Sequence, residues 1–278
     1  MRNYKKILKR SLALAIAATF ATNAALAEAA DFTASTISEV TNILRNQGLA
    51  RNTGFTIQFT GSEDDLNYIF DEDSTVFYYD LATLDDANTT NDADYIVGNI
   101  DFSVDNWMST DDSGEVIQIN YKYFETTAQT EYVNKETPQI LSELNVANMS
   151  NYDKVKTIHD YVCNHITYVD DADNCSSAYS AYSTGKGLCN SYALCMYKLL
   201  VSAGVPCKWI GGTAGTGRDS GGHAWNIVAL GDKWYNLDAT WDDSEDGTIL
   251  YDYFLKGSND FDEADTSQVH TPDKPYTN

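Results

Sequence analysis

The stretch HAWNIVALGDKWYNLDAT, from His223 to Thr240, has the pattern of two strands joined by a tight turn. The segments His223–Leu230 and Lys233–Thr240 are the two predicted strands. Gly231-Asp232 lies between them, and a two-residue connection of this composition is typical of a β-hairpin. The sequence therefore predicts an antiparallel pair of strands here.

The register of this hairpin would bring a histidine and an aspartate to one face of the sheet. If Leu230 and Lys233 flank the turn, the numbers of opposed residues add up to 463, so Trp225 faces Asp238. His223 then points to the same side as Asp238 and lies diagonally from it, about 7–8 Å away at the backbone. Two side chains can bridge that distance, but a shift of one residue would move Asp238 to the opposite face. The predicted His–Asp pair depends on this register.

Upstream, the stretch GKGLCNSYALCMYKLL, Gly185–Leu200, predicts an amphipathic helix that begins at Cys189. The partial positive charge at the start of a helix stabilises a thiolate, so Cys189 is a candidate nucleophile. The alternative is that Cys189 is one small buried side chain among five cysteines, an odd number that leaves at least one outside any disulfide within the chain. No disulfide is predicted.

A cysteine nucleophile needs a base within hydrogen-bond reach and a third group that orients the base. The chain has four histidines. His159 and His165 lie six residues apart on a predicted helix and do not share a face, and His270 lies in the C-terminal tail. His223 begins a strand after a glycine-rich loop, where a side chain can reach a cleft. We therefore expect His223 to be the base and Asp238 to orient it.

The order of elements predicts an α+β fold, because a helix is followed by consecutive antiparallel strands. The helix that carries the nucleophile should pack on the antiparallel sheet. The preceding residues, 28–124, form a small acidic β-rich region of unknown role, with sixteen Asp and Glu and no Lys or Arg between Asn52 and Tyr121.

The N-terminus predicts export. A basic start, an apolar middle and small residues up to Ala27 are typical of a secretory signal peptide over residues 1–27, with cleavage near Ala27. We expect a secreted, extracellular protein without a membrane span after cleavage. The net charge of −23 argues against nucleic-acid binding, which needs clustered Lys and Arg.

Three blocks of sequence resemble a known family. They are GKGLCNSYALCMYKLLVSAGVPC, GGHAWNIVALGDKWYNLDATWDD and YDYFLKGSNDF, and they resemble the bacterial transglutaminase-like domain. This is the kyphoscoliosis-peptidase and cytokinesis-protein branch of the papain-like fold. The resemblance covers residues 126–278, which places a catalytic domain at 125–278. It implies a Cys–His–Asp triad that maps onto Cys189, His223 and Asp238.

The resemblance implies a cofactor-independent cysteine enzyme that acts on protein or peptide amide bonds, with no metal site. Cys189 would form a thioester, which water or an amine resolves, and the backbone N–H of Cys189 would be the first oxyanion donor. The family usually has Gln-Gly after the cysteine, where this chain has Asn190-Ser191, so the rate could differ. This departure leaves open an alternative, a non-catalytic cell-surface binding module on the same scaffold.

Two further features lie near the predicted triad. Trp241 follows the hairpin, and we expect it to contact substrate. The acidic run from Asp242 to Ile249 resembles the first half of a calcium-binding EF-hand loop, but Tyr253 would occupy the twelfth position, where that loop needs Glu. We therefore interpret the run as a surface loop.

Overall fold

The structure is a computed structural model. It describes residues 30–71, 74, 76–77, 93–101, 107–111, 114–171, 174–215, 221–244, 246–266, 268–273 and 276. The predicted signal peptide, residues 1–27, lies outside the described residues. Within them, no helix has both the length and the apolar character needed to cross a membrane.

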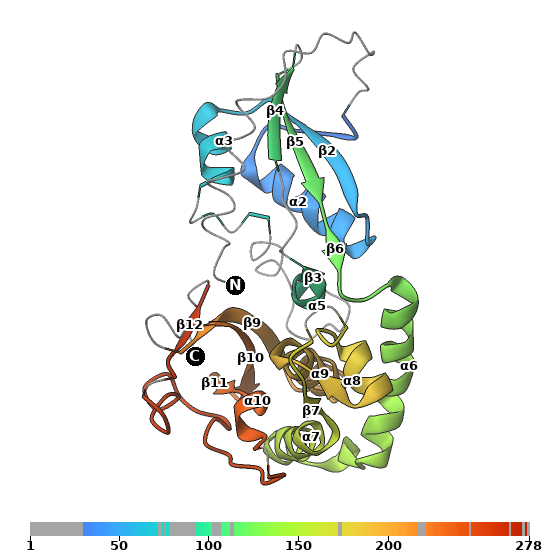
Figure 1. Cartoon of the computed structure of the whole chain (residues 1–278), viewed down its shortest axis with the longest axis vertical. Helices are drawn as coiled ribbons and strands as arrows, with labels where there is room; N and C mark the ends of the chain where they lie inside the picture. Colours follow the sequence, from blue (N-terminus) through green and yellow to red (C-terminus); the bar gives the residue numbers. More distant parts are fainter. Residues whose placement is uncertain are drawn as a thin grey trace. The chain divides into compact units, whose positions relative to one another are not determined.

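The chain folds as two compact units, which are described separately (Figure 1). The first comprises the described residues of Met1–Leu84 and Ile100–Tyr123, and the second those of Asp85–Asn99 and Phe124–Asn278. The described residues of Asp85–Asn99 group with the second unit, and the later division falls between Tyr123 and Phe124.

The first unit contains a four-stranded sheet in the order β1-β2-β5-β4. The alternation of apolar residues in β2 buries Phe55, Ile57 and Phe59 on one face. Helix α2 begins at the N-cap Thr36 and buries Val40 and Leu44. The elements are β1 (Phe32–Ala34), α2 (Ile37–Leu49), β2 (Gly54–Phe59), α3 (Glu63–Ile69), β3 (Ile100–Asp101), β4 (Trp107–Asp111), β5 (Gly114–Asn120) and β6 (Lys122–Tyr123).

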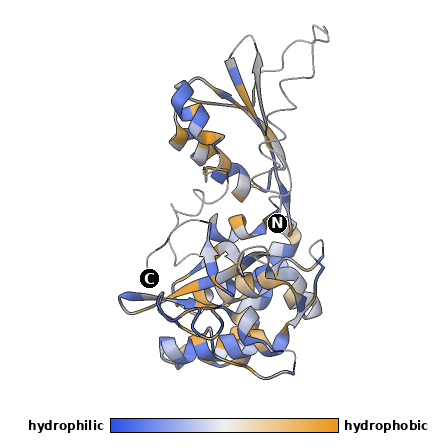
Figure 2. Cartoon of the chain, turned by 60° about the vertical axis from the view of Figure 1, so that its left-hand side comes forward, coloured by the Kyte–Doolittle hydropathy of each residue, from blue (hydrophilic) through white to orange (hydrophobic). Residues whose placement is uncertain are grey.

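The second unit combines helices with a four-stranded antiparallel sheet in the order β11-β10-β9-β12. Figure 2 shows hydrophobic residues interspersed with hydrophilic ones on the helices. The elements are α5 (Ala93–Asn99), α6 (Thr127–Glu143), η1 (Val146–Asn148), α7 (Asn151–His165), β7 (Thr167–Tyr168), α8 (Ala178–Thr184), β8 (Lys186–Gly187), α9 (Cys189–Ser202), β9 (Cys207–Ala214), β10 (Gly221–Leu230), β11 (Lys233–Leu237), α10 (Ala239–Asp242) and β12 (His270–Pro272).

Helix α9 is the central helix of this unit. It contacts β9 and β10 of the sheet on one side and α7 and α8 on others. Its residues from Ser191 to Val201 are all buried, as expected for a helix that is covered all round. Even Lys198 is buried, and its Nζ donates to Asn134 Oδ1 at 2.9 Å and lies 4.0 Å from the ring centre of Tyr95. The α+β prediction, with the Cys189 helix packed on an antiparallel sheet, is confirmed.

The predicted hairpin register is confirmed from Leu230↔Lys233 to Asn226↔Leu237. The predicted strand to Thr240 is wrong beyond that point, because β11 ends at Leu237 and α10 follows. Asp238 is the N-cap of α10, and its Oδ1 accepts from the backbone N–H of Thr240 at 2.9 Å. A short acidic side chain that caps a helix competes with continued strand pairing. The predicted pairing of Trp225 with Asp238 is therefore not formed.

Candidate active site

Helix α9 begins at Cys189, as predicted. The preceding residue, Leu188, makes no side-chain hydrogen bond to the helix start. The first-turn N–H groups therefore keep a partial positive charge that favours an anion. The Cys189 side chain is half-buried, whereas the other four cysteines are buried. All five are free thiols, and Cys189 is the most accessible of them.

Asn190, the departure from the family pattern, holds the start of α9 in place. Its Nδ2 donates to Gly98 O at 2.7 Å and to Ser176 O at 2.6 Å. Its Oδ1 accepts from Trp209 Nε1 at 2.9 Å. One side chain thus joins α9 to the end of α5, to the segment before α8 and to strand β9. Its amide group is fully used within the scaffold.

Ser191 has a similar role on the other side of the helix start. It is fully buried, and its Oγ donates to Cys175 O at 2.6 Å. Strand β8 passes so close that a Cβ on Gly187 would lie 2.6 Å from Ser191 Cβ. A side chain at position 187 would thus collide with the start of α9, so glycine is needed there for the chain to approach Cys189 closely.

Replacing Asn190 by alanine should destabilise the second unit. The change removes the hydrogen bonds that Asn190 makes with Trp209 Nε1 and with two backbone carbonyls, which costs about 2–3 kcal/mol in the free energy of unfolding. Chemical denaturation measures this loss, and Asn164→Ala is the matched control because Asn164 is exposed and donates to Asp160 O of its own helix. Equal, small effects of both changes would contradict the role given to Asn190.

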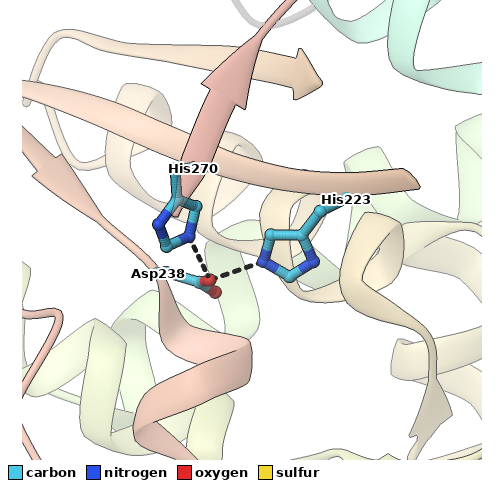
Figure 3. A group of neighbouring side chains, drawn as sticks. All are labelled: His223, Asp238 and His270. Atoms are coloured by element: carbon cyan, nitrogen blue, oxygen red, sulfur yellow. Dashed lines mark hydrogen bonds and ion pairs between the residues drawn. The ribbon is translucent and has the colours of Figure 1, made fainter. Parts of the chain in front are cut away.

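His223 and Asp238, predicted as a pair, are in direct contact (Figure 3). His223 Nε2 and Asp238 Oδ2 are 2.6 Å apart, and the two residues are 8% and 1% exposed. His223 lies on β10, and Asp238 lies directly after β11 as the cap of α10. The predicted pair thus forms although the strand pairing from which it was predicted does not extend to Asp238.

The charges in this pair stabilise one another. Burial disfavours the charged His223 ring, but the charge and hydrogen bond of Asp238, with a smaller contribution of the Cys189 sulfur, raise the pKa of His223 to about 10. Burial likewise disfavours ionised Asp238, but His223 and His270 hold its pKa below the usual range. Since Nε2 of His223 faces Asp238, Nδ1 is the ring nitrogen left for the Cys189 thiol. The structure therefore brings Cys189, His223 and Asp238 together in the order that a triad needs.

His270, set aside in the sequence as a tail residue, lies beside this pair (Figure 3). Its Nε2 is 3.1 Å from Asp238 Oδ2, the atom that also contacts His223. Its Nδ1 is 2.6 Å from Asp262 Oδ1. Strand β12 delivers His270 to the site by pairing with β9.

Trp241 also lies against the two histidines. Its ring centre is 4.9 Å from that of His223 and 4.3 Å from that of His270. On another side it lines an open depression of about 480 Å³, together with Thr240, Leu250 and Tyr253 and the acidic residues Asp243, Asp252 and Asp265. The lining includes neither Cys189 nor His223. Contact of Trp241 with substrate remains a prediction.

Among the described residues, the one cluster with the composition of a metal site is His223, Asp238 and His270, whose candidate ligand atoms lie within 4.8 Å of one another. The 2.6 Å separation of His223 Nε2 from Asp238 Oδ2 is a hydrogen bond. Two ligands of a tetrahedral zinc ion, each about 2.0–2.1 Å from the metal, would be roughly 3.3 Å apart. The side chains are thus arranged for hydrogen bonding rather than for holding a metal.

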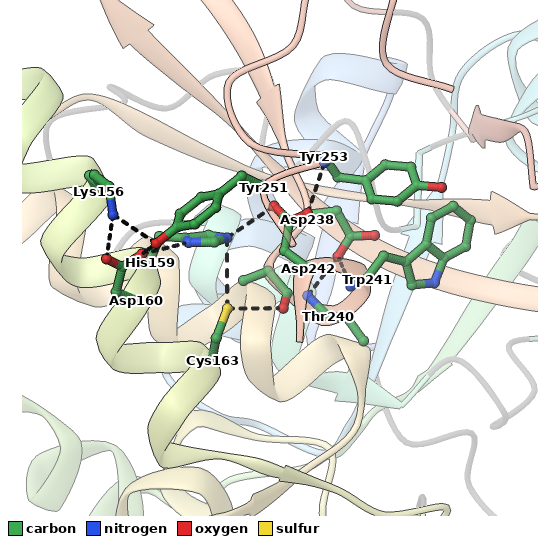
Figure 4. A network of polar contacts seen from close by, with 11 residues as sticks. Lys156, His159, Asp160, Cys163, Asp238, Thr240, Trp241, Asp242, Tyr251 and Tyr253 are labelled. Carbon is green, nitrogen blue, oxygen red and sulfur yellow. Dashed lines mark hydrogen bonds and ion pairs between the residues drawn. The ribbon is translucent and has the colours of Figure 1, made fainter. Parts of the chain in front are cut away.

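The acidic run that begins at Asp242 is anchored in the interior at its first residue, so the prediction of a surface loop is wrong there. Asp242 is fully buried. Its Oδ2 lies 3.1 Å from His159 Nε2, and its Oδ1 accepts from the backbone N–H of Tyr253 at 2.8 Å (Figure 4). The carboxylate that would be the first ligand of an EF-hand loop is therefore used inside the unit.

The fold and site together define an α+β protein with a cysteine at a helix start facing a histidine–aspartate pair. Residues 138–239 match the family model of the transglutaminase-like superfamily, and the three predicted triad positions lie within this match. The chain contains a transglutaminase-like domain.

Similar solved structures are distant. One described as a TGase is 17% identical, with 49% of this chain and 44% of that chain covered and a TM-score of 0.37. A proposed cysteine protease from Cytophaga hutchinsonii is 16% identical, over 62% of this chain and 67% of that chain, with a TM-score of 0.36. The periplasmic domain of TgpA from Pseudomonas aeruginosa, bound to ethylmercury, is 18% identical, over 46% of this chain and 55% of that chain, with a TM-score of 0.31.

The chain thus spans 44% of the length of the first structure and 55% of that of the third. These likenesses are too distant to carry an argument about activity. No curated protein matches the chain.

Proposed function

We propose that the protein is an exported cysteine enzyme that acts on peptide or protein amide bonds through a thioester. The observation that carries this proposal is the buried contact of His223 with Asp238, beside the half-buried Cys189 at the start of a helix. Three groups so arranged have the roles of base, orienting acid and nucleophile.

In the first step, the Cys189 sulfur attacks the carbonyl carbon of an amide. The C–N bond then breaks, a thioester forms, and the imidazolium of His223 gives its proton to the leaving amine. The backbone N–H of Cys189 is a donor for the oxyanion that develops on the carbonyl oxygen. Asp238 stabilises the charged ring and fixes its orientation throughout.

In the second step, His223 takes a proton from water or from an amine, which attacks the thioester. The carbon–sulfur bond breaks and the Cys189 thiol is restored. Water gives a carboxylic acid, which is hydrolysis, and an amine gives a new amide, which is transamidation. We favour hydrolysis, because bulk water competes with any amine.

The predicted signal peptide supports action outside the cytoplasm, on extracellular or cell-wall peptide. The negative net charge of −23 supports a protein or peptide substrate over a nucleic acid. No cofactor takes part in this mechanism. The alternative of a non-catalytic binding module drew on Asn190 and Ser191, and both side chains form hydrogen bonds that hold the start of α9. We therefore do not propose that alternative.

Labelling of the native protein with iodoacetamide tests the proposal. We expect Cys189 to be alkylated well before the four buried cysteines, as read by mass spectrometry of the digested protein. The Cys189→Ala variant should lose this fast labelling and all hydrolysis of peptide substrates, whereas Cys195→Ala, a change at a buried cysteine of the same helix, should keep both. Labelling of Cys189 no faster than that of the same thiol in the denatured chain would overturn the proposal.

A further inference from the structure

We propose that His270, held by Asp262, is a positioning residue that fixes Asp238 and places a positive charge beside the Cys189–His223 pair. This inference rests on the proposed function, because it assigns a role within the same site.

Each carboxylate oxygen of Asp238 makes two polar contacts. Oδ1 accepts from the backbone N–H of Thr240 at 2.9 Å and of Trp241 at 3.4 Å. Oδ2 contacts His223 Nε2 at 2.6 Å and His270 Nε2 at 3.1 Å. A carboxylate has about four acceptor sites, so Asp238 is held on both oxygens and cannot rotate without breaking several bonds. His270 supplies one of the two contacts that come from outside α10.

The contacts of His270 determine its charge. Nε2 faces the Asp238 carboxylate, and Nδ1 faces that of Asp262, at 2.6 Å. A neutral imidazole has one N–H, so one of its nitrogens would direct a lone pair at a carboxylate oxygen. Only the doubly protonated ring donates to both carboxylates. The two contacts are thus those of a doubly protonated ring.

The carboxylates and aromatic rings packed against this ring are compatible with a cation, whereas a charged His223 ring opposes it. The charged or titratable neighbours are Asp238, Asp262 and His223, the last with its ring centre at 5.4 Å, together with Tyr253 at 5.8 Å. Aromatic rings cover the remaining sides, with Phe261 stacked at 4.1 Å and Trp241 at 4.3 Å. Ring faces at such distances stabilise a cation. His270 itself is 8% exposed, so solvent screens its charge only weakly.

The backbone around His270 is fixed as well. In strand β12, His270 pairs with Ala214 and Pro272 pairs with Gly212 of β9. The approach at Gly212 is so close that a Cβ there would lie 2.3 Å from Thr271 O. The backbone N–H of His270 also donates to Asp262 Oδ2 at 3.2 Å. Asp262 thus holds both the ring and the backbone of His270.

The side chains form a chain of alternating charge, in the order Asp262, His270, Asp238 and His223. Within this chain, His270 affects the Cys189–His223 pair in two ways. It keeps Asp238 ionised and directed at His223, and its positive charge makes loss of a proton from the Cys189–His223 pair easier. Removal of the charge should move the ionisation of that pair to higher pH.

The charge of His270 can be measured directly in the unaltered protein. Proton–nitrogen NMR spectra of the histidine rings distinguish one protonated ring nitrogen from two. We expect both nitrogens of His270 to be protonated at pH 7, as assigned by comparison with the His270→Gln variant. A single protonated nitrogen would overturn the proposal, whether or not any variant folds.

The second test measures the rate of alkylation of Cys189 by iodoacetamide as a function of pH. In His270→Gln, which keeps a donor without charge, and in His270→Phe, which keeps only the ring shape, we expect the profile to move to higher pH by about one unit. His270→Phe should also lower the rate about tenfold, with partial recovery in His270→Gln. His165→Gln is the matched control, since His165 contacts Ala181 O, away from this chain of charges.

The outcomes separate the two proposals. If Cys189 of the wild-type protein does not react faster than a denatured thiol, the proposed function fails. If it does react, but folded His270→Gln has the wild-type pH profile, then the role given to His270 is wrong and the proposed function stands. A purely structural role of His270 would lower the stability and leave the pH profile in place.

Discussion

At pH 6, replacing His223 by alanine is expected to slow the alkylation of Cys189 about 50-fold. In the wild-type protein, Asp238 and Cys189 outweigh the effect of burial and raise the pKa of His223 to about 10. The ring is therefore charged at pH 6 and stabilises a thiolate beside it. Without the ring, an ordinary thiol with a pKa near 8.5 is only about 0.3% ionised at this pH.

The predicted factor is smaller than the change in thiolate population because a more basic thiolate is a better nucleophile, which offsets part of the loss. The same reasoning predicts the pH dependence. At pH 9.5 an ordinary thiol is largely ionised, so the difference between the variant and the wild-type protein should nearly vanish. Stopped labelling followed by mass spectrometry at both pH values measures the two ratios.

A change in the accessibility of Cys189 would have a different pH dependence. A variant that merely exposes Cys189 would react faster at both pH values, and a variant that buries it would react more slowly at both. His165→Ala, a change at a partly buried histidine of α7, should leave the rate unchanged. A pH-independent ratio for His223→Ala would show that His223 is not the partner of the thiol.

Local signals in the sequence were sufficient for half of the site. The Gly231-Asp232 turn fixes the register of its hairpin, because a two-residue turn leaves little freedom in which residues pair. The two glycines and the apolar pattern placed the start of α9 at Cys189. Asp238 was predicted from a strand pairing that in the structure ends one residue earlier, at Leu237. Its capping of α10 is also a local interaction, and Asp followed by Ala-Thr-Trp could have indicated it.

The other half depends on contacts that no local pattern specifies. His270 meets Asp238 across 32 residues of chain, and β12, the strand that carries it, has only three residues. The one sequence signal was in its partner strand, where Gly211-Gly212 permits a close approach of another backbone. Asp242 reads as a surface residue in an acidic run, because its buried partner, His159, lies 83 residues earlier.

Two sets of contacts meet at α10, the single helical turn Ala239–Asp242. They are the contacts of Asp238 with the site histidines and the contact of Asp242 with His159. The residue before this turn, Asp238, orients the His223 ring, and its last residue, Asp242, is bound to His159 of α7 (Figure 4). The site is thus connected to α7 through one turn of helix. We infer that the His159–Asp242 contact holds α10, and with it Asp238, in position.

Replacing Asp242 by alanine is expected to lower the free energy of unfolding by about 3–5 kcal/mol, because it leaves a buried charge without its partner. His159 is fully buried, with Nδ1 3.3 Å from Asp160 Oδ1 and Nε2 3.1 Å from Asp242 Oδ2. Burial lowers the proton affinity of the ring, but hydrogen bonds of the ring with Asp160, Asp242 and Cys163 outweigh it and raise the pKa of His159 to about 11. The ring is therefore charged at neutral pH, and without Asp242 it keeps only the half-buried Asp160 and a long contact of 3.7 Å with Cys163 Sγ.

The sign of the pH dependence follows from the raised pKa. A histidine with a pKa near 6.5 in the unfolded chain and about 11 in the folded protein stabilises the fold fully below pH 6.5. This contribution is lost as the pH rises toward 11, with a slope of up to about 1.4 kcal/mol per pH unit. The difference in stability between the wild-type protein and His159→Gln should therefore be largest near pH 6 and should shrink at alkaline pH.

Urea denaturation of the wild-type protein, Asp242→Ala and His159→Gln at pH 6 and pH 9 measures both effects. Asp252→Ala is the matched control, since Asp252 is an exposed acid of the segment that follows the same helix. If Asp242→Ala unfolds with the stability of Asp252→Ala, the buried pair does not hold α10. A stability difference for His159→Gln that grows from pH 6 to pH 9 would show that the ring is neutral in the folded protein, because a buried neutral histidine destabilises the fold at acidic pH instead.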